Sequence, residues 1–182
     1  MKLMFASDIH GSAYYCEKML ECYRKENAER LWILGDILYH GPRNDLPKEY
    51  APKKVIPMLN EIKEQICAVR GNCDTEVDQM VLEFPILADY SLLVEGDLRI
   101  YATHGHVYNE QHMLPLMPGD ILIHGHTHIY EAKKSGEQYI LNPGSVSIPK
   151  GGNPATYAIL EVGVFSIKDL DGQVQKSIDL RK

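Results

Sequence analysis

Seven side chains with metal-binding chemistry stand out in the 182-residue sequence, because each follows the end of a short apolar run. In chain order they are Asp8, His10, Asp36, Asn72, His104, His126 and His128. Carboxylate and amide oxygens combined with imidazole nitrogens, without thiolate, suit manganese, iron, cobalt or zinc. One ion does not need seven ligands, whereas two ions about 3.5–4 Å apart that share one carboxylate would use them all.

Taken singly, most of these residues have an ordinary structural explanation. Asp8 and His10 beside a turn could be a helix cap and a partly exposed histidine, and Asn72 could occupy a left-handed turn position. The run from His124 to His128 is different, because it holds three histidines in five residues. Alternate residues of an extended chain point the same way, so His126 and His128 could face one cavity. The conjunction of all seven predicts a metal site.

The apolar runs that precede these residues are too short for helices and are read as buried strands. They cover residues 3–6, 31–34, 66–69, 98–102 and 121–123. In the first half they alternate with two amphipathic segments, a helix over 13–29 and a helix over 53–64 with Pro57 in its first turns or at a break. This alternation predicts a largely parallel sheet, whose carboxyl edge is where open α/β sheets bind ligands.

The second half has a different pattern. Residues 91–95 and 98–103 flank Gly96 and Asp97, which is a strong hairpin signal. Further short strands are expected over 129–133, 138–141, 156–161, 164–169 and 174–178. We therefore expect an antiparallel or mixed sheet here, packed on the first sheet with helices outside.

Composition limits the classes of function. A chain of 182 residues with 45% hydrophobic content suits one domain over residues 1–182. The net charge of -6, without a basic run, gives no footprint for nucleic acid or an anionic membrane. No signal-peptide core or bilayer-length span is found, so a cytoplasmic location is expected. Its four cysteines lack a C-x-x-C pair and are read as reduced thiols.

The ordered motifs resemble those of the calcineurin-like metallophosphoesterase superfamily. They are D-x-H at 8–10, G-D at 35–36, G-N-x-D at 71–74, His104 and G-H-x-H at 125–128. The short length, H-G-P-R-N at 40–44 and N-P-G-S-V-S-I-P at 142–149 are similar to the compact bacterial YfcE-type phosphodiesterases. The resemblance implies a four-layer α/β/β/α sandwich of two mixed sheets, with the site where the loops of the two sheets meet.

The resemblance also implies a role for each ligand. One ion would be held by Asp8, His10 and His128, a second by Asn72, His104 and His126, with Asp36 bridging the two. Two divalent ions and two aspartates leave about +2 in the site, which explains phosphate binding by an acidic protein. A bridging water or hydroxide would attack phosphorus in line. Mn²⁺ is the favoured ion, with Zn²⁺, Fe²⁺, Co²⁺ and Ni²⁺ as alternatives.

One position departs from the family pattern, which often reads G-N-H-[DE] where this chain has Cys73 and Asp74. A thiol with an ordinary pKa of about 8.5 is a poorer proton donor than imidazolium. This favours diesters over monoesters, although Cys73 could also simply fill space. The pattern thus predicts a catalytic centre of Asp36, Asn72, Cys73, Asp74 and His104.

Other polar residues are assigned less directly. Arg43 and Asn44 are expected to contact a substrate phosphate, Arg43 by a bidentate fork, and the alternative is a solvated loop arginine. His106 and His124 are read as partners of the ligands or as buried donors. The string from Asn142 to Ser145 predicts a type II β-turn without a catalytic role.

Three functions remain open. The leading interpretation is a metal-dependent phosphodiesterase acting on a small or nucleotide-like diester. A phosphomonoesterase or nuclease is the second, although the chain lacks a basic groove and no stable nucleic-acid complex is expected. The third is a non-catalytic interaction scaffold, as in a retromer subunit of similar fold whose ligand set is incomplete. The resemblance also allows a homo-oligomer.

Overall fold

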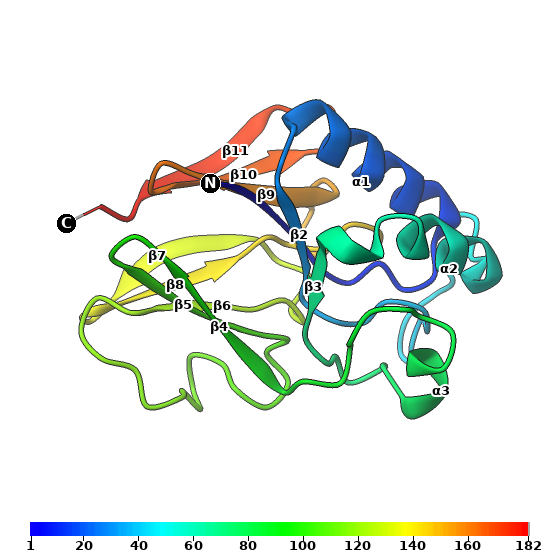
Figure 1. The fold of residues 1–182 in the computed structure, drawn as a ribbon, viewed down its shortest axis with the longest axis horizontal. Helices are drawn as coiled ribbons and strands as arrows, with labels where there is room; N and C mark the ends of the chain where they lie inside the picture. Colours follow the sequence, from blue (N-terminus) through cyan, green and yellow to red (C-terminus); the bar gives the residue numbers. More distant parts are fainter. Residues whose placement is uncertain (182) are drawn as a thin grey trace.

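Two β-sheets lie face to face in the computed structural model, which describes residues 1–181 (Figure 1). The first has six strands in the order β11-β10-β9-β1-β2-β3. These are β1 (Lys2–Ala6), β2 (Arg30–Ile33), β3 (Ile66–Ala68), β9 (Thr156–Glu161), β10 (Val164–Asp169) and β11 (Val174–Asp179). The second has five strands in the order β4-β5-β6-β8-β7. They are β4 (Tyr90–Glu95), β5 (Leu98–Thr103), β6 (Ile121–Ile123), β7 (Glu131–Ser135) and β8 (Gln138–Asn142).

Strand β1 is central to the first sheet, where it runs parallel to β2 and antiparallel to β9. Its side chains alternate between two cores. Met4 and Ala6 pack under the helices, whereas Leu3 and Phe5 pack between the sheets. A strand covered on both faces needs apolar residues at every position, which is why this run shows no polar alternation.

The helices lie at the outer face of the first sheet and near its end (Figure 1). They are α1 (Ala13–Glu26), α2 (Pro52–Asn60), the short 3₁₀ helix η1 (Lys63–Gln65) and α3 (Glu76–Gln79). Helix α1 ends three residues before the predicted limit, because Asn27 adopts the left-handed conformation with φ +52° and closes the helix through its N–H to the carbonyl of Arg24. Helix α2 ends at Asn60, and Pro57 lies inside it.

The second sheet is mixed, as predicted. The three last strands, β9 to β11, were expected in it but instead extend the first sheet in antiparallel pairing, so the first sheet is mixed rather than largely parallel. Strands β4 and β5 form the antiparallel hairpin, β5, β6 and β8 are parallel, and β7 returns antiparallel to β8. The predicted two-sheet α/β sandwich is therefore confirmed. Its outer layer on this side is a loop rather than a helix, because within residues 1–181 no helix follows α3, and the connection between β5 and β6 runs along this side (Figure 1).

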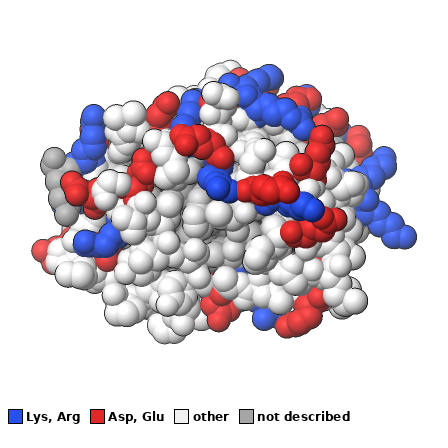
Figure 2. All heavy atoms as spheres, viewed as in Figure 1, with Lys and Arg blue, Asp and Glu red and all other residues white. Residues whose placement is uncertain are grey.

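The surface over the second sheet carries little charge. Figure 2 shows Lys, Arg, Asp and Glu interspersed over the helical half, and few charged side chains over the β4–β8 half of the same view. Tyr90, Leu92 and Val94 of β4 are exposed there. No continuous basic patch is present on this face, in agreement with the acidic composition. Within the described residues, no helix has the length and apolar character needed to cross a bilayer.

Candidate metal centre

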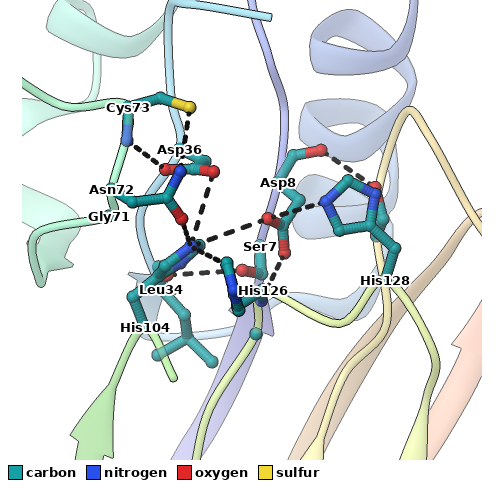
Figure 3. Close-up of polar contacts among 12 residues, drawn as sticks. Ser7, Asp8, Leu34, Asp36, Gly71, Asn72, Cys73, His104, His126 and His128 are labelled. Carbon is teal, nitrogen blue, oxygen red and sulfur yellow. Dashed lines mark hydrogen bonds and ion pairs between the residues drawn. The ribbon is translucent and has the colours of Figure 1, made fainter. Parts of the chain in front are cut away.

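The loops that follow β1 and β2 remain joined to each other by backbone hydrogen bonds after the strands end. The N–H of Asp8 donates to the carbonyl of Gly35 at 3.2 Å, and the N–H of His10 donates to the carbonyl of Asp36 at 2.9 Å. The loops after β3, β5 and β6 bring further side chains to the same place (Figure 3). The predicted convergence of distant segments, at the place where the loops of the two sheets meet, is thus present in the structure.

The backbone is unusual at five of the predicted ligands. Asp8, His10, Asp36, His126 and His128 all have φ between +49° and +67°. Residues other than glycine rarely adopt this conformation, which costs about 1–3 kcal/mol each and persists only where the surroundings enforce it. Strain concentrated at these positions indicates a functional constraint on their side-chain directions.

One group of donor atoms consists of Asp8 Oδ1, His10 Nε2 and His128 Nε2. The Asp8 oxygen lies 3.6 Å from the His10 nitrogen and 3.2 Å from the His128 nitrogen, and the two nitrogens are 3.3 Å apart. Atoms about 2 Å from one ion would lie roughly 3–3.5 Å from each other. Asp8 Oδ1 is fully buried and has no hydrogen-bond partner among the described residues. A buried, unpartnered carboxylate oxygen facing two imidazoles fits a divalent ion.

A second group surrounds His104 Nε2. Asp36 Oδ2 lies 3.4 Å from this nitrogen, Asn72 Oδ1 3.1 Å and His126 Nδ1 3.2 Å. Asp36 Oδ2 also lies 3.6 Å from His10 Nε2, which belongs to the first group. A single carboxylate oxygen therefore faces both groups, as a bridging ligand would.

The imidazoles are oriented from behind. The Nδ1 atoms of His10, His104 and His128 lie 2.8, 2.6 and 2.6 Å from the carbonyls of Tyr39, Leu34 and Ile148. A ring that donates from Nδ1 presents the lone pair of Nε2 to the site. His126 presents Nδ1 instead, and its backbone N–H donates to Asp8 Oδ2 at 3.0 Å.

Asp74 supports the bridge from the next loop. Its carboxylate accepts the backbone N–H groups of Gly71, Asp36 and Ile37 at 2.7, 2.8 and 2.9 Å, and its side chain is buried. Asp36 Oδ1 in turn accepts the N–H of Cys73 at 2.8 Å. Asp74 therefore holds the backbone around Asp36, and its predicted place in the catalytic centre stays a prediction. Gly71 is required because a Cβ there would lie 2.1 Å from Asp36 Oδ1.

Two serines in the 142–149 motif brace the first group. The hydroxyls of Ser145 and Ser147 donate to the carbonyl of Asp8 at 3.0 and 2.9 Å. Gly144 has φ +84°, which the predicted type II turn requires at that position. Sequence reasoning found the turn but missed this bracing, because small buried serines carry no recognisable spacing signal.

Electrostatics in the site are dominated by two buried carboxylates among imidazoles. Burial would raise the pKa of Asp8, but the imidazoles of His10 and His128 that face its carboxylate hold it well below its usual value. Burial would lower the pKa of His104, but Asp36 and Asp8 raise it to about 9. Burial and the neighbouring His104 lower the pKa of His126 to about 4. A metal ion at His104 Nε2 would therefore compete with a proton for this nitrogen.

A cavity of about 390 Å³ opens over the centre. Its walls are Asp36, Gly41, Pro42, Arg43, Asn44, Asn72, Cys73, His126, Thr127, His128 and Lys150. Arg43 and Asn44 thus line the cavity, and their predicted contact with a substrate phosphate stays a prediction. The Asn44 amide donates to the carbonyl of its own loop residue His40 at 2.8 Å. Burial and the nearby Asp36 raise the pKa of the Cys73 thiol to about 12, which keeps it neutral.

Two further histidines near the predicted ligands, His106 and His124, lie outside both groups. The His106 ring centre is 5.4 Å from that of His104, and its side chain is exposed. His124 is buried, and its Nδ1 lies 3.4 Å from the Asn142 amide. Burial lowers the pKa of His124, consistent with a neutral ring in the structural role that the sequence suggested.

Facing mixed sheets whose loops gather carboxylate, amide and imidazole donors define the architecture of a metallohydrolase. A family model of the calcineurin-like phosphoesterase superfamily domain matches residues 1–163, and the chain belongs to this superfamily. The resemblance inferred from the motifs is confirmed.

Individual relatives agree with this assignment. The chain is 51% identical over 173 residues to phosphodiesterase YfcE of Escherichia coli K12, covering 95% of this chain and 94% of the relative. A solved structure of the E. coli YfcE phosphoesterase matches with a TM-score of 0.98 at 49% identity over 100% of both chains. An archaeal phosphodiesterase matches with a TM-score of 0.66 at 25% identity, covering 98% and 99%. Vps29 of Entamoeba histolytica, at 22% identity, a TM-score of 0.64 and coverage of 98% and 99%, shares the fold.

Proposed function

We propose that the protein is a cytoplasmic, metal-dependent phosphodiesterase that acts on a small or nucleotide-like diester with two divalent ions, Mn²⁺ in the cell. The observation that carries the proposal is the position of Asp36 Oδ2, within 3.6 Å of His10 Nε2 and 3.4 Å of His104 Nε2. The 51% sequence identity of the chain to a phosphodiesterase supports the same reaction. Residues 1–182 would form one domain, which could associate into a homo-oligomer.

The residues present fit two ions. Asp8, His10 and His128 would hold the first, and Asn72, His104 and His126 the second, with Asp36 shared. When bound, the ions lower the pKa of water for in-line attack on phosphorus and offset the charge of the transition state. The chain itself orients three of the imidazoles, those of His10, His104 and His128, through backbone carbonyls. Arg43 would supply a cationic fork for the substrate phosphate.

The direct test joins metal analysis to a pair of substrates. The purified protein should contain close to two divalent ions per chain and should hydrolyse bis(4-nitrophenyl) phosphate faster than 4-nitrophenyl phosphate. Chelation should abolish the activity, and added Mn²⁺ should restore it. A chain that binds no divalent ion, or a preparation that hydrolyses neither ester after Mn²⁺ is added, would contradict the proposal.

The Cys73 position should set the preference for diesters. The Cys73→His variant places an imidazole in the cavity wall, where it can protonate a leaving group, a contribution that general acids commonly make. We expect the ratio of monoesterase to diesterase kcat/KM to rise at least about tenfold. Cys73→Ser is the control, because it removes the thiol without adding an imidazole. An unchanged ratio in Cys73→His would show that this position does not select the substrate.

A further inference from the structure

The cavity over the metal centre has two cationic side chains in its walls, and one of them has no assigned role. Arg43 comes from the loop after β2, whereas Lys150 comes from the segment between β8 and β9. Among residues 1–181, neither forms an ion pair with a carboxylate. Both positive charges are therefore free to meet an anion that enters the cavity.

Lys150 is anchored to the first ligand group through its backbone. Its N–H donates to the carbonyl of His128 at 3.0 Å, and His128 Nδ1 lies 2.6 Å from the carbonyl of Ile148. The N–H of Ile148 donates to Ser145 Oγ at 2.9 Å, and this hydroxyl donates to the carbonyl of Asp8 at 3.0 Å. The hydrogen bonds that orient Asp8 and His128 therefore also fix the backbone position from which the Lys150 side chain extends.

The charge in the cavity exceeds the need of a simple diester. Two divalent ions and the buried carboxylates of Asp8, Asp36 and Asp74 would together leave about +1, which already matches a phosphodiester that carries one negative charge. Arg43 and Lys150 add two more positive charges in a protein whose net charge is -6. Such an excess at one point of an acidic surface attracts a ligand with more than one negative charge.

We propose that Lys150 binds a second anionic group of the substrate, so that the substrate class is a phosphodiester that also bears a phosphate or carboxylate on one ester substituent. The inference rests on the proposed phosphodiesterase function. The segment over 142–150 would then have two roles. It braces the proposed metal ligands, and its Lys150 side chain would bind the second anionic group of the substrate.

The test uses two probes that differ by one phosphate. Thymidine 5′-(4-nitrophenyl phosphate) has only the diester, and its 3′-phosphorylated form has the second anionic group, while both release 4-nitrophenolate. In Lys150→Met we expect KM for the 3′-phosphorylated probe to rise about tenfold, with KM for the other probe and both kcat values within about twofold of wild type. Lys150→Arg should keep the wild-type KM for the 3′-phosphorylated probe. Raising the salt concentration should weaken the wild-type preference through screening.

A binding measurement separates this inference from the proposed function. Calorimetric titration should show that Lys150→Met binds thymidine 3′,5′-bisphosphate about tenfold more weakly and thymidine 5′-phosphate as tightly as wild type. Lys134→Met, which removes an exposed lysine of β7, should change neither. Equal losses for both nucleotides, or none, overturn the inference. If wild type hydrolyses neither probe, the proposed function fails, and calorimetry alone decides the role of Lys150.

Discussion

Replacing Asp36 by asparagine should remove both metal ions and lower diesterase kcat/KM at least about 1000-fold, because electrostatic stabilisation of the transition state depends on both ions. The basis is Asp36 Oδ2, which faces His10 Nε2 at 3.6 Å and His104 Nε2 at 3.4 Å. An asparagine side chain keeps the size of the aspartate but lacks its negative charge. Metal content by mass spectrometry and hydrolysis of bis(4-nitrophenyl) phosphate are the measurements.

The number of metal ions bound per chain distinguishes a bridging ligand from a ligand of one ion. His126→Gln should lose one ion, because His126 Nδ1 belongs only to the group around His104. Asp97→Asn, in the exposed β4–β5 turn, should keep two ions and full activity. Retention of two ions and wild-type rates in Asp36→Asn would remove Asp36 from the bridge. Circular dichroism should show that all three variants fold.

The ligand positions could be predicted from sequence because a short buried strand fixes where the residues that follow it must lie. Once residues 3–6 and 31–34 are read as parallel strands, Asp8 and Asp36 must come to one edge of a sheet. The left-handed backbone at both residues could not be predicted, since aspartate seldom adopts it without tertiary support. That support comes from Asp74 and the 142–149 segment, which lie far away in the sequence.

Boundaries were predicted less well where local rules conflict with tertiary contacts. Helix α3 was missed, although Thr75 and Asp78 form a capping box that signals a helix start. Strand β7 begins at Glu131, two residues after the predicted start, because His128 takes φ +60° and leaves Ile129 in the loop. The loop outside the second sheet, between β5 and β6, carries no periodicity, so the expectation of outer helices had no sequence support there.

Replacing Asp74 by alanine should cost both stability and metal affinity. The change leaves the N–H groups of Gly71, Asp36 and Ile37 buried without an acceptor, and each such group costs about 1–3 kcal/mol. Because these losses are not additive, we expect the free energy of unfolding of the metal-free protein to fall by about 3–5 kcal/mol. Urea denaturation measures this loss, and Mn²⁺ titration of the remaining folded protein measures affinity, which should fall about 10–100-fold.

Asp120 offers a matched control for general destabilisation. It is equally buried and accepts hydrogen bonds from the N–H of Met117 at 2.9 Å and from Arg99 Nε at 2.6 Å. These partners lie in the loop before β6 and in β5, outside both ligand groups. Asp120→Ala should therefore lose stability and keep wild-type Mn²⁺ affinity once folded. If Asp74→Ala behaved in the same way, its carboxylate would serve the fold alone. If only Asp74→Ala lost metal affinity, this would show that the hydrogen bonds from backbone N–H groups to the Asp74 carboxylate set the direction of the Asp36 carboxylate.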